Sequence, residues 1–312
     1  MMELRESARR ALDGLGLAAK EEKSWPLAIE LGWLLVSVPE SLGGLEQGLA
    51  GACAIQMELG RSLAATPVMS ATLAIEAIAH SELADRQVWI ERATSGDYVA
   101  APLSGDAAAV PSADKATHIL HASSDVVALV PGDQMKLTPR ATWDETRRLF
   151  DVEFDGNGVV LAQGAAAKGL SRRITTVRDF LIAADCIGGA TALLDKTVDY
   201  LLTRKQFGRP LALFQALKHR CADLKTMAAA AEALLNDAVV TQSEAKGRAA
   251  KLLACATYAK VAEEALQLHG GIGMTAEHHC HLFLKRALLN ERLGSASESC
   301  ELELASALLS AA

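Results

Sequence analysis

The sequence predicts a mainly α-helical protein with a small β domain in its middle. Half of the 312 residues are hydrophobic, while aromatic residues make up only 4%. Apolar residues also recur every three or four positions over long stretches, which is typical of helices. Only the middle of the chain alternates apolar and polar residues as strands do. We therefore expect an N-terminal helical domain over residues 1–95, a reduced central β domain over 96–168 and a C-terminal helical bundle over 169–312.

Charge and cysteine content exclude several classes of protein. The formal net charge is −7 and no long basic run is present, so nucleic acid is not an expected partner. The N-terminus is charged and amphipathic, and no stretch is apolar enough to span a bilayer, so we expect no membrane association. The cysteines form no C-x-x-C pair and lie mostly among apolar residues, which indicates reduced core thiols in a cytoplasmic protein. They are Cys53, Cys186, Cys221, Cys255, Cys280 and Cys300.

The N-terminal third reads as helices separated by loops. Val38–Leu45, V-P-E-S-L-G-G-L, interrupts the helical pattern with a proline and a glycine pair. The next helix ends at Thr66-Pro67, because the residue before a proline disfavours helix. Ser81–Thr94 reads as a further helical piece.

Strand signals fill the middle of the chain. His118–Leu120 and Asp125–Val130 are short and rich in β-branched or apolar residues, with a turn at Pro131–Asp133. Leu149–Asp155 alternates apolar and acidic residues before the turn at Gly156–Gly158.

Helical periodicity returns at Arg172 and persists to the end of the chain. The stripes are near-heptad, so antiparallel bundle packing is the natural way to bury them. Gly188-Gly189 lies inside the first of these helices, where glycine costs stability unless another backbone packs closely against it. A third long helix runs from Gly247 to Leu268.

Arg204–His219, R-K-Q-F-G-R-P-L-A-L-F-Q-A-L-K-H, separates the first two long helices. Gly208 and Pro210 break the helix, so an arginine, a turn and a glutamine meet at a corner. A guanidinium and the free N–H groups of a helix N-terminus suit a phosphate. An ordinary interhelical turn with a surface arginine is the alternative.

The second motif is Leu266–His281, L-Q-L-H-G-G-I-G-M-T-A-E-H-H-C-H. Its glycines permit close backbone approach and could cradle a pyrophosphate or ribityl chain, and we expect Thr275 to cap the next helix with Glu277 in its first turn. The three histidines beside Glu277 match no common zinc spacing. We expect no metal there, with capping and polar packing as the role of His278, His279 and His281.

Taken together and in this order, the two motifs resemble the C-terminal region of the acyl-CoA dehydrogenase family. V-P-E-S-L-G-G-L followed by M-E-L-G-R is similar to that family's N-terminal domain, so the resemblance covers nearly the whole chain. It implies a helical domain, a small β domain and a C-terminal four-helix bundle, assembled as a dimer or tetramer. It also implies oxidation of an acyl-CoA thioester to the trans-2-enoyl-CoA, with a carboxylate base and FAD as hydride acceptor.

The resemblance implies cofactor contacts at both motifs. Arg204 and Gln206 would contact the FAD pyrophosphate of a neighbouring subunit, and Phe207 belongs to the same segment. The other end of the cofactor would be held from the second motif. Polar helix surface is the alternative for the glutamines taken singly. The implied cofactor residues are Arg204, Gln206, Phe207, Gln215, Gln267, Gly270 and Gly271.

The chain departs from the family at the catalytic base, and we assign no catalytic residue. Leu293 stands before Gly294 where many members have a glutamate, and Glu291 and Glu298 are expected at the surface. Arg178 stands at the other position that members use. Two aspartates remain as possible bases, and a buried Asp185 would have a raised pKa or a hidden partner. They are Asp179 and Asp185.

The central domain also departs from the family. The segment Ala101–Val110 keeps only Ser104 and Asp106 of a stretch that packs on the flavin in other members.

Both departures fit one subunit of a heteromeric α2β2 acyl-CoA dehydrogenase. This chain would supply FAD contacts across a boundary to a second, catalytic subunit of the same family. An electron-transfer flavoprotein-type acceptor is implied, with a steroid side-chain or other bulky acyl-CoA as substrate. The alternatives are a self-sufficient homomeric dehydrogenase with an aspartate base, and a FAD-free structural subunit.

Overall fold

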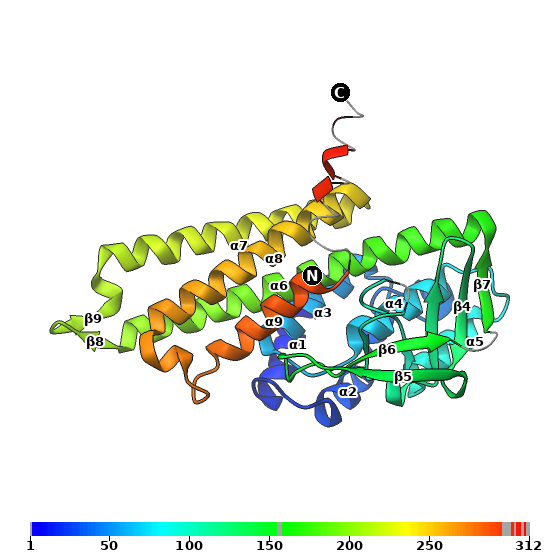
Figure 1. The fold of residues 1–312 in the computed structure, drawn as a ribbon, viewed down its shortest axis with the longest axis horizontal. Coiled ribbons are helices and arrows are strands. Elements are labelled where there is room, and N and C mark those ends of the chain that lie inside the picture. The colour runs from blue at the N-terminus through cyan, green and yellow to red at the C-terminus, as the bar shows by residue number, and fades with distance from the viewer. Residues whose placement is uncertain are drawn as a thin grey trace.

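The structure, a computed structural model, describes residues 2–105, 107–154 and 158–294, and beyond them residues 301, 302, 304–306 and 309. Its long helices lie together along most of the molecule, and the strands gather around the beginning of the longest helix (Figure 1). The predicted order of helices, strands and helices is confirmed. The domain boundaries at residues 95 and 168 stay a prediction.

In the described part of the chain, five α-helices precede the strands. Gly32 and Gly43 both take positive φ values, which end α2 and the short 3-10 turn Glu40–Leu42. The last helix begins at Arg86 rather than Ser81. The helices are α1 (Met2–Leu15), α2 (Glu21–Glu30), α3 (Gly48–Ser62), α4 (Val68–Ala79) and α5 (Arg86–Ser95).

Among the described residues, strands β1 to β7 form two small sheets. The first has the order β1-β3-β4-β7, with β1 parallel to β3 and the other pairs antiparallel. The second has the order β2-β6-β5. The predicted strands at 118–120, 125–130 and 149–155 are confirmed as β3, β4 and β6, whereas β1, β2, β5 and β7 were not predicted. Pro139 is tolerated in β5 because that strand lies at a sheet edge. The strands are β1 (Val99–Ala100), β2 (Val110–Pro111), β3 (His118–Ala122), β4 (Val126–Pro131), β5 (Met135–Arg140), β6 (Leu149–Phe154) and β7 (Val159–Gln163).

The C-terminal half is built on α6 (Gly164–Thr203), a helix of 40 residues. It is followed by α7 (Gln215–Thr241), α8 (Glu244–His269) and α9 (Cys280–Arg292). One correction concerns Thr275, which does not cap α9. Its Oγ1 donates to the Ile272 carbonyl at 2.8 Å, because α9 begins five residues later, at Cys280.

The cysteines of the described part are free thiols. Cys53, Cys186, Cys255 and Cys280 are buried and Cys221 is half-buried, as expected of core thiols, while Cys300 lies outside the described residues. Within the same part of the chain, no helix is both long and apolar enough to cross a membrane.

The glycine pair in α6 is explained by close packing. A Cβ on Gly188 would lie 1.9 Å from the Met57 carbonyl oxygen of α3, and a Cβ on Gly189 would lie 2.4 Å from Cζ of Tyr258 in α8. The prediction that another backbone packs closely here is therefore confirmed at Gly188, whereas Gly189 meets a side chain instead. At Gly188, the backbone of α3 occupies the place where a side chain of α6 would begin. The contact therefore leaves no room for a methyl group.

Replacing Gly188 by alanine is expected to destabilise the protein by about 1–3 kcal/mol, because overpacking outweighs the better helix propensity of alanine. Gly169→Ala is the matched control, since Gly169 lies in the same helix with nothing within 4 Å of an added Cβ. That variant should gain up to about 1 kcal/mol. Urea unfolding of both variants measures the difference, and equal effects would contradict the close contact.

Candidate functional site

The two motifs meet at one end of the helical bundle. After α6, the chain forms a hairpin of β8 (Lys205–Gln206) and β9 (Arg209–Pro210), seen at the tip of the molecule in Figure 1. Its turn uses Phe207 and Gly208, both with positive φ. The Tyr200 hydroxyl donates to the His269 carbonyl at 3.3 Å, and the two rings stack with centroids 4.4 Å apart. The end of α6 and the end of α8 are thereby joined.

All seven predicted cofactor residues are exposed at this end. A Cβ on Gly270 or Gly271 would meet nothing within 4 Å, so a ligand can approach this backbone closely. Gln215 is the first residue of α7, where backbone N–H groups are free to bind an anion. The cluster comprises Arg204, Gln206, Phe207, Gln215, Gln267, Gly270 and Gly271.

Apolar side chains surround these polar groups. Phe207 is 88% exposed and Met274 is 74% exposed, an uncommon state for such large side chains. An apolar surface rimmed by polar residues is typical of a protein interface. We call this surface, with the seven residues above, the bundle tip. Its exposed apolar members are Leu202, Phe207, Leu213, Ile272 and Met274.

Three side chains beside the bundle tip carry nitrogen or sulfur atoms of the kind that bind metal ions. His269, His278 and Cys280 each bring one such atom within 4.8 Å of the others, a grouping that differs from the histidines weighed in the sequence. Nδ1 of His269 contacts the Ala265 carbonyl at 2.8 Å, and its ring packs against that of His278 with centroids 4.3 Å apart. Burial lowers the pKa of both histidines and raises the pKa of the Cys280 thiol to about 11. The two histidine rings therefore pack against each other beside a buried thiol.

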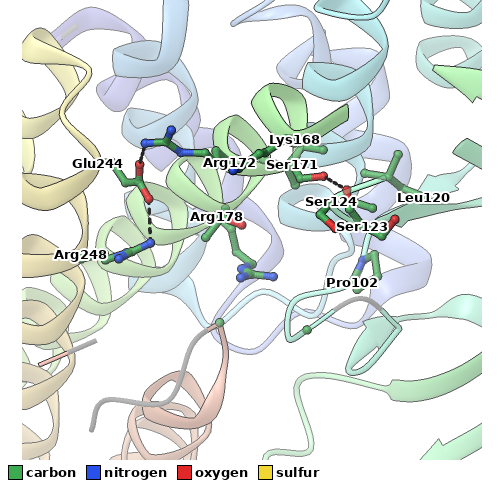
Figure 2. Close-up of a pocket in the computed structure, with 15 residues that line it drawn as sticks. Pro102, Leu120, Ser123, Ser124, Lys168, Ser171, Arg172, Arg178, Glu244 and Arg248 are labelled. Atoms are coloured by element: carbon green, nitrogen blue, oxygen red, sulfur yellow. Dashed lines mark hydrogen bonds and ion pairs between the residues drawn. The ribbon is translucent and has the colours of Figure 1, made fainter. Parts of the chain in front are cut away.

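A cavity of about 640 Å³ lies at the other end of α6, between that helix, the start of α8 and the β3–β4 turn (Figure 2). Arg178 and Gly294 both line it. The family resemblance assigns a catalytic glutamate either to the position of Arg178 or to that of Leu293, the residue before Gly294. The fold therefore brings one of these positions and the direct neighbour of the other to one cavity. Neither position offers an acid, because Leu293 is buried and apolar.

Among the cavity-lining residues that the structure describes, the one carboxylate is engaged by two guanidinium groups. Glu244 accepts from Arg172 and from Arg248, each at 2.7 Å (Figure 2). Arg178 is 7% exposed and reaches into the same space. The described lining residues thus carry more positive than negative charge at the place where the family reaction needs a base.

Asp185 is ruled out as a base by its partners. It is completely buried in α6 and accepts hydrogen bonds from Gln56 at 2.9 Å and Asn290 at 2.7 Å. Burial works to raise its pKa, but Arg147 and Arg286 hold the pKa below its ordinary value. Of the two expectations for a buried Asp185, the hidden partner is correct.

Asp179 is buried next to the cavity without lining it. Burial raises its pKa, and Lys251 is the main charge that opposes the shift. A Cβ on Gly294 would lie 2.8 Å from Lys251 Nζ and 3.3 Å from Asp179 Oδ1, so both groups adjoin Gly294.

The other acids considered in the sequence, and the loop residue Ser104, do not line this cavity in the described part of the chain. Glu291 lines a different cavity beside Trp143. Ser104 donates to the carbonyl of Arg292 at 3.3 Å and so ties its loop to the end of α9. Asp106 and Glu298 lie outside the described residues.

The sequence did not reveal a buried charge network next to Asp185. Arg286 of α9 donates to Asp144 at 2.8 Å and to Asp185 at 3.2 Å, and it is also hydrogen-bonded to Thr146. Arg286 shares the core-facing side of α9 with Phe283 and Asn290. The sequence pattern that could have revealed this network is the charged Arg286 at a core-facing position of a helix.

Comparisons with known proteins agree with these features. Residues 4–97 match the family described as acyl-CoA dehydrogenase, N-terminal domain, and residues 172–309 match acyl-CoA dehydrogenase, C-terminal domain. The chain is 36% identical over 268 residues to the acyl-CoA dehydrogenase IpdE2 of Mycobacterium tuberculosis, covering 86% of this chain and 80% of that protein. It is 34% identical to IpdE2 of Mycolicibacterium smegmatis, covering 84% of this chain and 80% of that protein.

Solved structures share the fold over the whole chain. The ChsE4-ChsE5 complex from Mycobacterium tuberculosis superposes with a TM-score of 0.89 at 22% identity, covering 99% of this chain and 96% of that one. The Tcur3481-Tcur3483 steroid ACAD variant gives 0.88 at 23% identity, covering 99% and 98%. Together with the family matches, these relatives show that the chain belongs to the acyl-CoA dehydrogenase family, whose members are FAD-dependent oxidoreductases.

Proposed function

We propose that this chain is the subunit of a heteromeric acyl-CoA dehydrogenase that supplies FAD contacts to a catalytic partner of the same family. One observation carries the proposal. The cavity is lined by Arg178, at one family position for the base, and by Gly294, which directly follows Leu293 at the other position. Neither an arginine guanidinium nor a leucine side chain can accept the proton next to a thioester carbonyl.

The length of α6 separates the cavity from the proposed cofactor contacts. Arg178 and Arg204 are joined by continuous helix up to Thr203. At about 1.5 Å per residue, this places them roughly 40 Å apart. The bundle tip therefore cannot contact the same part of a flavin as the chain's own cavity, and its exposed groups fit a cofactor seated in another subunit.

The residues of the bundle tip have separate roles in this proposal. The Arg204 guanidinium and the N-terminus of α7 bind the FAD pyrophosphate, because both favour negative charge. Gly270 and Gly271 let the other end of the cofactor approach the backbone, and Gln206, Gln215 and Gln267 donate amide hydrogens. The apolar rim packs on the partner subunit.

When bound, FAD would supply the hydride acceptor for oxidation of the acyl-CoA thioester to the 2-enoyl-CoA, and a carboxylate of the partner would remove the proton. An electron-transfer flavoprotein-type protein would be the electron acceptor. The assembly we propose is an α2β2 tetramer. Two of the solved structures with this fold, ChsE4-ChsE5 and Tcur3481-Tcur3483, are named as pairs of different chains. The name steroid ACAD on the second supports a bulky steroid side-chain acyl group as the substrate.

Flavin stoichiometry and native mass test the proposal. The chain purified alone should hold little FAD and show no dehydrogenase activity. Co-expressed with a family member encoded beside it, it should form a tetramer with one flavin for each pair of unlike chains. Stability should rise with the partner and FAD present, since both bind the folded state.

The same measurement separates the alternatives. One flavin per chain in an active homo-oligomer would favour the self-sufficient enzyme, with Asp179 as its base because its burial and raised pKa suit a proton acceptor. An assembly that stays colourless with its partner would favour the FAD-free structural subunit.

A further inference from the structure

The end of α8 and the start of α9 hold a group of side chains that the proposed function does not use. His269 is the last residue of α8, and Cys280 is the first residue of α9. His278 lies just before Cys280 in the segment that joins the two helices, orange in Figure 1. Each of the three side chains brings one nitrogen or sulfur atom within 4.8 Å of the other two. The fold thus gathers two imidazoles and a thiol at one point.

The ring of His269 is held as the ring of a metal-binding histidine usually is. Its Nδ1–H donates to the Ala265 carbonyl at 2.8 Å, because a carbonyl oxygen can only accept. The other ring nitrogen, Nε2, therefore carries a lone pair. It is buried and has no hydrogen-bond partner among the described residues, a costly state that a metal ion would relieve. A backbone carbonyl that fixes one imidazole nitrogen while the other binds the ion is the common arrangement around zinc.

The other two side chains are held beside this ring. The Sγ of Cys280 lies 3.5 Å from Nδ1 of His269, and the two histidine rings have centroids 4.3 Å apart. The backbone N–H of Cys280 donates to Nδ1 of His278 at 3.3 Å, so the start of α9 fixes these two residues relative to each other. Zinc bonds of about 2.0–2.3 Å in tetrahedral geometry place ligand atoms roughly 3.5 Å apart. Binding therefore needs the three atoms to approach by about 1 Å, which rotation of the side chains can supply.

We propose that His269, His278 and Cys280 bind one Zn²⁺ ion. Thiolate sulfur and imidazole nitrogen are zinc ligands, whereas Mg²⁺ and Ca²⁺ prefer oxygen. The Cys280 thiol would lose its proton to solvent as the sulfur–metal bond forms. Because His278 is only half-buried, a water molecule can reach the ion and take the fourth position.

The sequence predicted no metal in this segment, because the spacing of His278, His279 and His281 matches no common zinc set. The folded chain brings together a different set, in which His269 comes from the preceding helix. The ion would join the two ends of a segment that contains the open glycines Gly270 and Gly271. Since binding needs neither flavin nor a partner subunit, the site goes beyond the proposed function.

The metal content of the full chain, expressed without a histidine tag, tests the proposal. After dialysis against metal-free buffer, plasma mass spectrometry should find one zinc ion per chain. Replacement of the zinc by Co²⁺ should produce the absorption band of a cobalt–thiolate bond, which reports directly that a cysteine binds the ion.

Two pairs of variants assign the ligands. His278→Ala removes a half-buried ligand, so the fold should be retained, and zinc affinity measured against a competing chelator should fall at least about tenfold. His279→Ala is the matched control, because it removes the adjacent exposed histidine, which is outside the group. Cys280→Ala should abolish the cobalt–thiolate band, whereas Cys221→Ala, at a half-buried thiol of α7, should keep it.

Each outcome decides the question. Zinc that the wild type and His279→Ala retain but His278→Ala loses supports the site. A wild type without zinc and without a cobalt–thiolate band would overturn it. Equal zinc affinity in His278→Ala and the wild type would also overturn it, because the ion would then be bound elsewhere. FAD and the partner subunit do not enter these measurements, so the zinc site and the proposed function can each fail while the other stands.

Discussion

Replacing Arg286 by alanine is expected to destabilise the fold by about 3–5 kcal/mol, the cost of leaving buried charges without their partner. The Arg286 side chain is 2% exposed and pairs with Asp144 and Asp185, which come from a loop of the β region and from α6. Burial acts to raise the pKa of both carboxylates, but nearby arginines lower it below the ordinary range. For Asp144 the main one is Arg286, and for Asp185 they are Arg147 and Arg286. Without the guanidinium, both carboxylates stay buried with fewer charge partners.

Denaturant unfolding followed by circular dichroism measures the loss. Lys285→Ala is the control, because Lys285 is the adjacent residue on α9 and its partner Glu145 is 73% exposed. That variant should unfold close to the wild-type midpoint, as surface pairs contribute little. If Arg286→Ala unfolded at the midpoint of Lys285→Ala, the network would not be what joins α9 to the β region.

Replacing Arg204 by alanine is expected to strip most of the FAD from the assembled complex. Arg204 is exposed at the start of the hairpin, and its backbone N–H is already bound to the Tyr200 carbonyl at 2.8 Å, so the fold does not depend on its side chain. Loss of charge-assisted hydrogen bonds of about 1.5–3 kcal/mol corresponds to roughly 10–100-fold weaker binding.

The flavin absorbance of the complex after gel filtration measures this loss. Lys205→Ala serves as the control because it removes the same charge from the next residue of β8. Unchanged flavin in Arg204→Ala, or equal loss in both variants, would contradict the placement of the pyrophosphate at Arg204. Elution as an intact tetramer is required in both cases, so that loss of flavin is not loss of assembly.

The sequence by itself determined the elements with strong local signals. The long apolar stripes gave α6, α7 and α8, and Gly208 with Pro210 marked the break between the first two. Gly188-Gly189 correctly indicated a close approach. Elements with weak local signals were mispredicted. Strand β5 was not predicted because it contains Pro139, and the start of α9 was misplaced because a glycine-rich segment precedes it. The spacing of apolar residues that predicts helices and strands depends only on nearby residues in the sequence. It can therefore be recognised without knowing the tertiary structure.

Only the tertiary structure decided which residues share a site. Arg178 and Gly294 are more than a hundred residues apart, and the contact of α6 with α9 and the β region brings them to one cavity. Asp185 looked like a candidate base until the fold surrounded it with Arg147, Arg286 and Asn290. A carboxylate's pKa depends on burial and on charges brought close from distant parts of the chain. Such charges have no fixed spacing in the sequence, which is why the chemistry of this cavity became readable only from the folded chain.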